Sequence, residues 1–190
     1  MTEFAANRAV FVDRDGVLSV EGGDYVTCAA KLRLLPGVGK AIARLNAAGF
    51  LVIVFTNQAG VGRGYMTMEA LNDVHARLQC EISKAGGTIT AIYACPHAPE
   101  TGCGCRKPLP GMLLQAAREH NIDLKQSYAV GDSPRDIAAG QAAGCQTLLV
   151  LSGHTASYEP ASFPTPLPDY VFETLIAATD WLVQARPNLN

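Results

Sequence analysis

The stretch Arg8-Ala9-Val10-Phe11-Val12-Asp13-Arg14-Asp15-Gly16 decides how this chain folds. Its first five residues form a short, mainly apolar run, which predicts a buried β-strand over residues 8–12. Asp13 and Asp15 follow at once, so the strand is expected to present two carboxylates from one loop. Carboxylates this close repel each other unless a proton or a cation lies between them, and Mg²⁺ prefers oxygen ligands of this kind. The pair therefore indicates a magnesium site, and the alternative is an ordinary turn with solvated acids.

Strand and helix patterns alternate along the remaining chain. Further strands are expected over residues 50–55, 89–94, 128–130, 147–151 and 170–172. Helices are expected over residues 36–49, 67–86, 110–120, 134–143 and 174–185. The alternation predicts an α/β, Rossmann-like fold: a doubly wound, mostly parallel sheet with helices on both faces and an active site outside the carboxyl ends of the strands. No insertion between the motifs is long enough for a separate cap domain.

Composition narrows the class of protein. The chain has 190 residues, of which 48% are hydrophobic and 17% charged, which fits a single domain over residues 1–190. The net charge is −2 and no run of Lys or Arg is present, so a small-molecule partner is expected rather than nucleic acid or a membrane. Residues 1–8 lack the features of a signal peptide, and no stretch approaches the roughly 18 apolar residues of a membrane span. We expect a cytoplasmic monomer.

Polar residues follow the other predicted strands. Thr56 and Asn57 offer a hydroxyl and an amide for phosphate oxygens, Arg106 and Lys107 supply cations, and Gly131-Asp132-Ser133-Pro134-Arg135-Asp136 adds carboxylates. Because the carboxyl ends of parallel strands meet at one edge of a sheet, one crevice is expected to collect these groups.

The four segments resemble, in the same order, the four motifs of the haloacid dehalogenase superfamily of phosphotransferases. The resemblance implies that Asp13 attacks phosphorus and that Asp15 protonates the leaving oxygen and then deprotonates water. Lys107 and Thr56 would steady the phosphoryl group. Mg²⁺ would be held by the Asp13 carboxylate, the Asp15 backbone carbonyl and Asp132. An acid at residue 15 favours phosphate-ester hydrolysis over dehalogenation, because an alkoxide leaving group needs a proton and a halide does not. Asp136 is a candidate for a supporting role.

A cluster of cysteines points to a second metal. Cys95, His97, Cys103 and Cys105 supply three thiolates and one imidazole, enough to close a tetrahedral structural Zn²⁺ site. The alternative is a chance cluster in a Pro- and Gly-rich loop. Bound zinc would present Arg106 and Lys107 rigidly beside the active site. The three scattered cysteines, Cys28, Cys80 and Cys145, are expected to be small buried hydrophobic residues.

Three segments narrow the resemblance to the zinc-containing subfamily of histidinol-phosphate and heptose-bisphosphate phosphatases. These segments are Thr56-Asn57-Gln58-Ala59-Gly60-Val61-Gly62-Arg63-Gly64, Cys95-Pro96-His97 and Cys103-Gly104-Cys105-Arg106-Lys107-Pro108 followed by Pro110-Gly111-Met112-Leu113. They are most similar to the heptose members, which implies a sugar phosphate substrate. The implied substrate-binding residues are Asn57, Gln58, Arg63, Arg106, Glu21, Asp24 and Tyr25.

The sequence departs from the heptose members at two places. Ser133 stands where those members often have lysine, and the sugar-contacting segment is rich in glycine, so the preferred anomer stays open. The alternatives are a histidinol-phosphate phosphatase, a polynucleotide 3′-phosphatase, and a zinc-stabilised module that binds phosphate without turnover. His75, His120, His154 and Trp181 are expected to have no catalytic role, His154 because it lies in a loop without partners.

Overall fold

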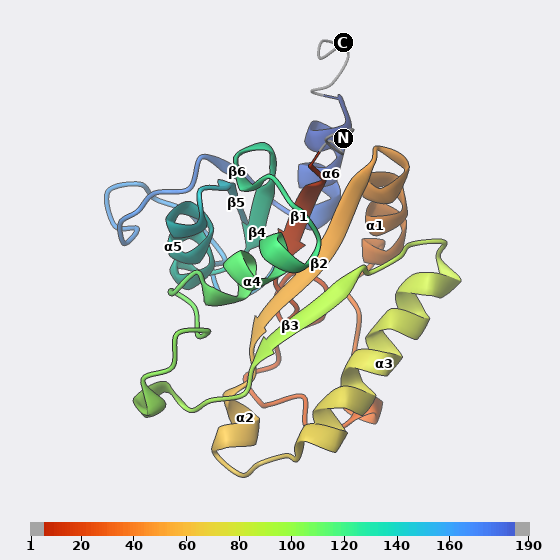
Figure 1. The fold of residues 1–190 in the computed structure, drawn as a ribbon, viewed down its shortest axis with the longest axis vertical. Helices are drawn as coiled ribbons and strands as arrows, with labels where there is room; N and C mark the ends of the chain where they lie inside the picture. Colours follow the sequence, from red (N-terminus) through yellow and green to blue (C-terminus); the bar gives the residue numbers. More distant parts are fainter. Residues whose placement is uncertain (1–5, 185–190) are drawn as a thin grey trace, which may run out of the picture.

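The computed structural model describes residues 6–184 and contains one parallel sheet (Figure 1). The strands are β1 (Arg8–Val12), β2 (Phe50–Asn57), β3 (Ala91–Cys95), β4 (Tyr128–Gly131), β5 (Gln146–Val150) and β6 (Tyr170–Phe172). The α-helices are α1 (Val38–Ala47), α2 (Ala59–Gly62), α3 (Met68–Lys84), α4 (Gly111–Glu119), α5 (Pro134–Ala143) and α6 (Leu175–Gln184). Short 3₁₀ turns cover Ala29–Lys31, Pro99–Thr101 and Leu124–Gln126. The predicted α/β fold is confirmed.

The strand order places β1 near the centre of the sheet. The order is β3-β2-β1-β4-β5-β6, and all neighbouring strands are parallel. The chain runs outward from β1 to β3 and then returns to β4 on the other side of β1. The order therefore reverses between β1 and β4, which is the place where doubly wound sheets open a crevice at the carboxyl ends of their strands.

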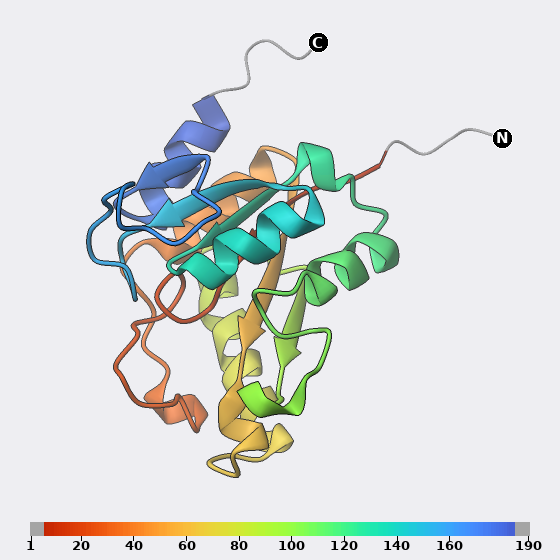
Figure 2. The same cartoon turned by 90° about the vertical axis from the view of Figure 1, so that its left-hand side faces the viewer.

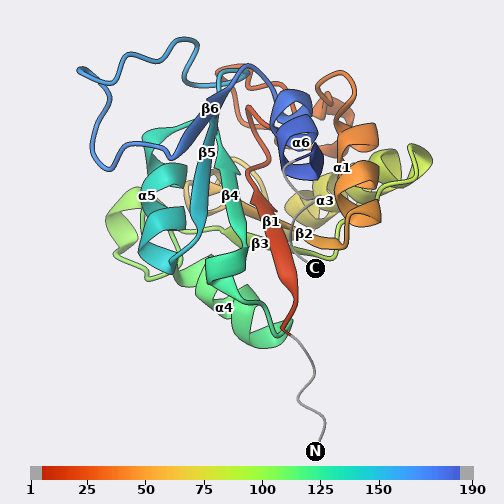
Figure 3. The same cartoon turned by 90° about the horizontal axis from the view of Figure 1, so that it is seen from above.

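Helices cover both faces of the sheet (Figure 3). Val10 and Val12 point to the side of α1, α3 and α6, whereas Ala9 and Phe11 point to the side of α4 and α5. All four side chains are fully buried, which explains why the strand reads as a continuous apolar run. Each connection between consecutive strands of residues 6–184 holds at most three helical elements, which is too little for a separate cap domain. No helix of this part of the chain has the length and apolarity needed to cross a membrane.

Some element boundaries differ from the predictions. β2 continues through Thr56 and Asn57 because these residues pair with Ala94 and Cys95 of β3, so the backbone ladder outlasts the apolar run. The expected glycine-rich loop after β2 contains one helical turn, α2. The last helix begins at Leu175, and the expected end at residue 185 lies outside the described residues.

The cysteine prediction was correct for Cys145 and wrong for Cys28 and Cys80. Cys145 is buried against α4 and α5, but Cys28 and Cys80 are exposed. Cys28 directly precedes a surface 3₁₀ turn without buried residues, and Cys80 lies on the outer side of α3, whose buried stripe is Leu71, Val74, Leu78 and Ile82. Helical periodicity alone identifies this outer side for Cys80.

Candidate active site

A cavity of about 440 Å³ lies at the carboxyl ends of β1, β2 and β4. Figure 2 shows that the segment after β1, the turn α2 and the loop after β3 gather at this same end of the sheet. The cavity brings together every residue predicted for catalysis, magnesium and substrate: Asp13, Asp15, Glu21, Asp24, Tyr25, Thr56, Asn57, Gln58, Arg63, Arg106, Lys107 and Asp132. Residues far apart in the sequence thus meet as the topology requires.

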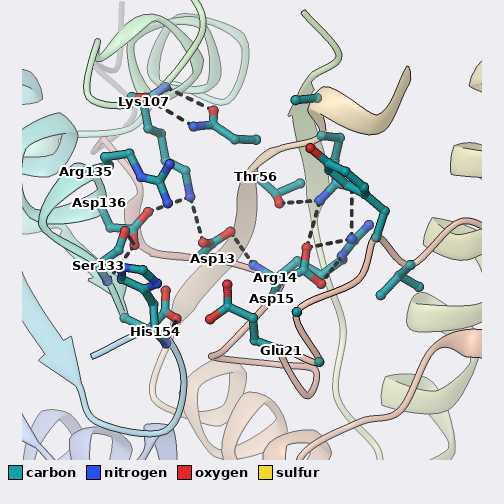
Figure 4. A pocket seen from close by; sticks show the side chains of 18 of the residues that line it. Asp13, Arg14, Asp15, Glu21, Thr56, Lys107, Ser133, Arg135, Asp136 and His154 are labelled. Atoms are coloured by element: carbon teal, nitrogen blue, oxygen red, sulfur yellow. Dashed lines mark hydrogen bonds and ion pairs between the residues drawn. The ribbon is translucent and has the colours of Figure 1, made fainter. Parts of the chain in front are cut away.

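Lys107 is the cation at the base of the cavity, and its side chain is buried (Figure 4). Its Nζ atom lies 2.8 Å from Asp13 Oδ2 and 2.5 Å from Asp136 Oδ1. The same ammonium donates to the Phe55 carbonyl at 3.1 Å and stands over the Phe55 ring. Although burial opposes the charged form, the two carboxylates raise the pKa of Lys107. Lys107 therefore stays a fixed ammonium beside Asp13.

Asp136 and Ser133 form the base of α5. The Asp136 Oδ2 atom accepts hydrogen bonds from the Ser133 backbone N–H at 3.0 Å and from its hydroxyl at 2.6 Å, completing a capping box. Because Oδ1 of Asp136 faces Lys107, one carboxylate both caps the helix and anchors the ammonium. Ser133 therefore holds the Asp136 carboxylate and caps α5, a role that the sequence motif did not indicate.

Asp13, Asp132 and Asp136 form a carboxylate cluster whose oxygens lie within 4.8 Å of one another. Burial raises the pKa of Asp13 to about 6, with repulsion from Asp136 adding to the rise and Lys107 opposing it. Burial, followed by repulsion from Asp136 and Asp13, raises the pKa of Asp132 to about 8. Lys107 balances only part of the negative charge of three carboxylates, and this oxygen donor set fits a hard divalent cation.

Gly16 allows this cluster to form. Its φ is +83°, and a Cβ atom there would lie 2.0 Å from Asp132 Oδ2, so a side chain is excluded. The loop after β5 also contributes, because the His154 backbone N–H donates to Asp132 Oδ2 at 2.6 Å. The backbone of two loops thus fixes the Asp132 carboxylate.

Asp15 lies in a separate hydrogen-bonded network. Arg14 donates to it twice, from Nε at 2.9 Å and from Nη2 at 2.6 Å, and Gln58 Nε2 donates at 2.9 Å. A fourth bond comes from the Ser19 hydroxyl at 3.0 Å. Burial opposes ionisation of Asp15, but Arg14 and these hydrogen bonds outweigh it and lower the pKa. In this conformation Asp15 is an ionised carboxylate.

Residues at the end of β2 contact both the hydrogen-bonded network around Asp15 and the backbone of Lys107. Thr56 is buried, and its Oγ1 accepts from Gln58 Nε2 at 2.9 Å. The Asn57 side chain clamps the backbone of Lys107, accepting from its N–H at 3.0 Å and donating to its carbonyl at 3.1 Å. Asn57 and Gln58 line the cavity while bonding to protein groups, so their contact with substrate stays a prediction.

The rim of the cavity carries the remaining predicted substrate-binding residues. Glu21 and Asp24 are exposed, and the Tyr25 hydroxyl accepts from Arg63 Nη1 at 2.8 Å. Arg106 Nη1 donates to the His97 carbonyl at 3.3 Å, which ties the rim to the cysteine cluster. Polar and charged groups dominate this entrance, as a sugar phosphate would require.

The predicted zinc ligands come together beside this rim, and the structure groups Cys95, His97, Cys103 and Cys105 as a possible metal site. Cys95 Sγ lies 3.5 Å from Cys103 Sγ, and Cys105 Sγ lies 3.5 Å from Cys103 Sγ and 3.3 Å from His97 Nδ1. Ligand atoms at ordinary zinc distances and tetrahedral angles are separated by roughly 3.5–3.8 Å. The donor set therefore fits Zn²⁺.

The cavity also contains residues that the sequence did not assign to it. Arg14 is 1% exposed and pairs with Asp15. From the sequence it was expected only to be part of the loop that carries Asp13 and Asp15. Arg135 and His154 line the cavity as well. His154 contributes its backbone N–H to Asp132, and the expectation that it has no catalytic role stays a prediction. Of these three residues, Arg135 was the one whose place in the cavity the sequence could indicate, because it lies three positions after Asp132.

Comparison with known proteins agrees with this geometry. Residues 104–178 match a family model described as HAD-hydrolase-like. The chain is 39% identical to the D-glycero-beta-D-manno-heptose-1,7-bisphosphate 7-phosphatase of Pseudomonas aeruginosa, over 92% of this chain and 97% of the relative. It is 42% identical to the enzyme of that name from Bordetella bronchiseptica, over 77% and 82%. The crystal structure of the D,D-heptose 1,7-bisphosphate phosphatase from B. bronchiseptica, complexed with magnesium and phosphate, superposes with a TM-score of 0.86 at 38% identity, covering 94% of this chain and 99% of that one.

Proposed function

This chain belongs to the heptose-1,7-bisphosphate 7-phosphatase family of haloacid-dehalogenase-like hydrolases, and we propose that it removes the 7-phosphate from D-glycero-β-D-manno-heptose 1,7-bisphosphate. The observation that carries the proposal is the buried Lys107 ammonium between Asp13 and Asp136, at the base of a polar cavity. This arrangement places a nucleophilic carboxylate next to a cation that can receive a phosphoryl oxygen. The names of two relatives support the β anomer.

In the first step, one oxygen of the Asp13 carboxylate attacks phosphorus, and the bond from phosphorus to the sugar oxygen breaks. The electron pair goes to the sugar oxygen, which takes a proton from Asp15. Lys107 and the Thr56 hydroxyl hold the transferring oxygens. Asp13 is oriented for attack because its Oδ1 accepts from the Arg14 N–H at 2.6 Å while Oδ2 faces Lys107.

In the second step, Asp15 takes a proton from water, whose oxygen attacks phosphorus and releases phosphate from Asp13. The ionised form stabilised by Arg14 and Gln58 suits this base role. The acid role in the first step needs a protonated Asp15 that has turned away from Arg14 toward the leaving oxygen. Arg14 thus favours the ionised state of Asp15, which the second step uses, over the protonated state, which the first step uses.

We propose that Asp13 and Asp132, with the backbone carbonyl of Asp15, hold Mg²⁺. Bound magnesium supplies charge neutralisation between the nucleophile and the phosphate dianion. We further propose that the cysteine cluster holds Zn²⁺ as a structural ion, because its four protein ligands leave no position for water. The bond from Arg106 to the His97 carbonyl links that loop to the rim of the cavity.

The proposal is tested by comparing kcat/KM for both anomers of heptose 1,7-bisphosphate and for histidinol phosphate, with Mg²⁺ present. We expect the β-bisphosphate to exceed the other two substrates by at least about ten-fold, a difference of roughly 1.4 kcal/mol in transition-state binding. A higher value for histidinol phosphate would assign the chain to the alternative activity. Binding of these compounds without turnover of any of them would indicate a phosphate-binding module.

A further inference from the structure

Five cationic side chains line the active-site cavity, and four of them have hydrogen-bond or ion-pair partners in the protein. Arg14 pairs with Asp15, Lys107 pairs with Asp13 and Asp136, Arg63 donates to Tyr25, and Arg106 donates to the carbonyl of His97. The fifth is Arg135. Within residues 6–184 its guanidinium has neither a hydrogen-bond acceptor nor a carboxylate partner, and its side chain is exposed.

The backbone of Arg135 is nevertheless firmly held. It is the second residue of α5, between Pro134 and Asp136, in the turn that the Ser133–Asp136 capping box closes. Figure 4 shows Arg135 on the wall of the cavity that Ser133, Asp136 and Lys107 also form. A long side chain therefore starts from a fixed point on this wall and keeps all its donors free for a ligand.

The two deeper cations of the cavity, Lys107 and Arg14, are held by carboxylates of the protein. Lys107 is buried against Asp13, and Arg14 is buried against Asp15 and Gln58, so neither can turn to the entrance. A substrate with two phosphates presents a second group of charge about −1.5 to −2 at its far end. Such a group needs a donor at the rim, and a guanidinium matches phosphate oxygens with two parallel hydrogen bonds.

We propose that Arg135 binds the second phosphate of a bisphosphate substrate, and so makes the enzyme prefer sugar bisphosphates to monophosphates. This inference rests on the proposed function and adds the residue that recognises the far end of the substrate. Arg135 makes this contact without touching the reacting phosphorus. Its loss therefore lowers kcat/KM for the bisphosphate selectively.

The test compares kcat/KM for heptose 1,7-bisphosphate and heptose 7-phosphate in the wild type and in Arg135→Gln, Arg135→Lys and Arg118→Gln. Arg118 is an exposed arginine of α4 outside the cavity, so its variant removes the same charge elsewhere. We expect Arg135→Gln to lower the ratio of bisphosphate to monophosphate activity by about ten-fold, the value of one charge-assisted hydrogen bond. Arg135→Lys should recover part of the ratio, and Arg118→Gln should leave it unchanged.

The outcomes separate the two proposals. A wild type that turns over neither heptose phosphate would overturn the proposed function and this inference with it. An active wild type whose preference survives in Arg135→Gln would overturn the role of Arg135 alone. Equal losses on both substrates would likewise reject it, because they would place Arg135 at the reacting phosphate or in the stability of α5.

Discussion

The Nζ atom of Lys107 lies 2.8 Å from Oδ2 of Asp13, and neither side chain has more than 12% of its surface exposed. The contact joins the end of the first strand to a residue more than ninety positions later in the sequence. In the proposed mechanism, this cation holds an oxygen of the phosphoryl group while Asp13 attacks phosphorus. The predictions below follow from how the protein holds this pair and the groups around it.

Asp136→Asn should reduce both stability and activity. The change removes one of two carboxylates from a buried ammonium, and breaking a buried ion pair costs roughly 3–5 kcal/mol. Lys107 would also lose the anchor that sets its position beside Asp13. Urea unfolding and steady-state kinetics measure the two effects. Glu81→Gln is the control, because it breaks solvent-exposed pairs with Arg77 and Lys84, which contribute little to stability. Similar losses in both variants would contradict the role given to Asp136.

Asp15→Asn should slow substrates with poor leaving groups far more than activated aryl phosphates. A sugar alkoxide needs the proton that Asp15 donates, whereas an aryl oxide needs little protonation. The loss on the sugar ester should reach about 10²–10⁴-fold. Rates measured on a series of aryl phosphates of different leaving-group pKa check this expectation. Equal losses along the whole series would exclude Asp15 as the acid.

Cys103→Ser should lower zinc content and misplace the loop that carries Arg106 and Lys107. We expect a raised KM and a lower kcat, since a displacement of about 1 Å can cost roughly 10²-fold. Circular dichroism should show that the sheet survives. Cys28→Ser, a change at an exposed cysteine outside the cluster, should keep both zinc and activity. Elemental analysis decides the matter: a zinc-free protein with full activity would refute the structural role.

Without metal, the carboxylate cluster should make the protein less stable as pH rises. The folded protein holds protons on Asp13 and Asp132 up to about pH 6 and about pH 8, whereas an unfolded aspartate releases its proton near 3.8. More protons are then bound in the folded state, so this contribution to the free energy of unfolding falls between about pH 4 and pH 8. Urea titrations in EDTA should show the fall in the wild type and a smaller one in Asp132→Asn. An identical pH dependence in both would contradict the prediction, and added Mg²⁺ should oppose the fall.

Most of the fold could be predicted from the sequence because both faces of the sheet are covered. Continuous apolar runs such as residues 8–12 follow directly from that double burial. The motif residues were predictable for a related reason, since parallel strands must bring their carboxyl ends together. The grouping of Cys95, His97, Cys103 and Cys105 was predictable because the four residues lie within eleven consecutive positions.

The remaining features depend on contacts between distant segments. Nothing around Arg14 in the sequence indicates that it is buried, because Gln58, its partner in the network, lies 44 positions away. His154 reaches Asp132 through a loop that no motif marks. Arg135 was visible in the sequence, but only the structure shows that it alone among the cavity's cations keeps its guanidinium free within residues 6–184.

The most direct test of the central claim is to trap the phosphorylated enzyme. The protein is mixed with heptose 1,7-bisphosphate and Mg²⁺, quenched in acid within a single turnover, and digested for peptide mass spectrometry. We predict a phosphoryl group on the peptide that carries Asp13, and neither that group nor turnover in Asp13→Asn, whose loss should reach about 10⁴-fold or more. Turnover by Asp13→Asn within ten-fold of the wild type, with no phosphorylated Asp13 peptide at any quench time, would contradict it.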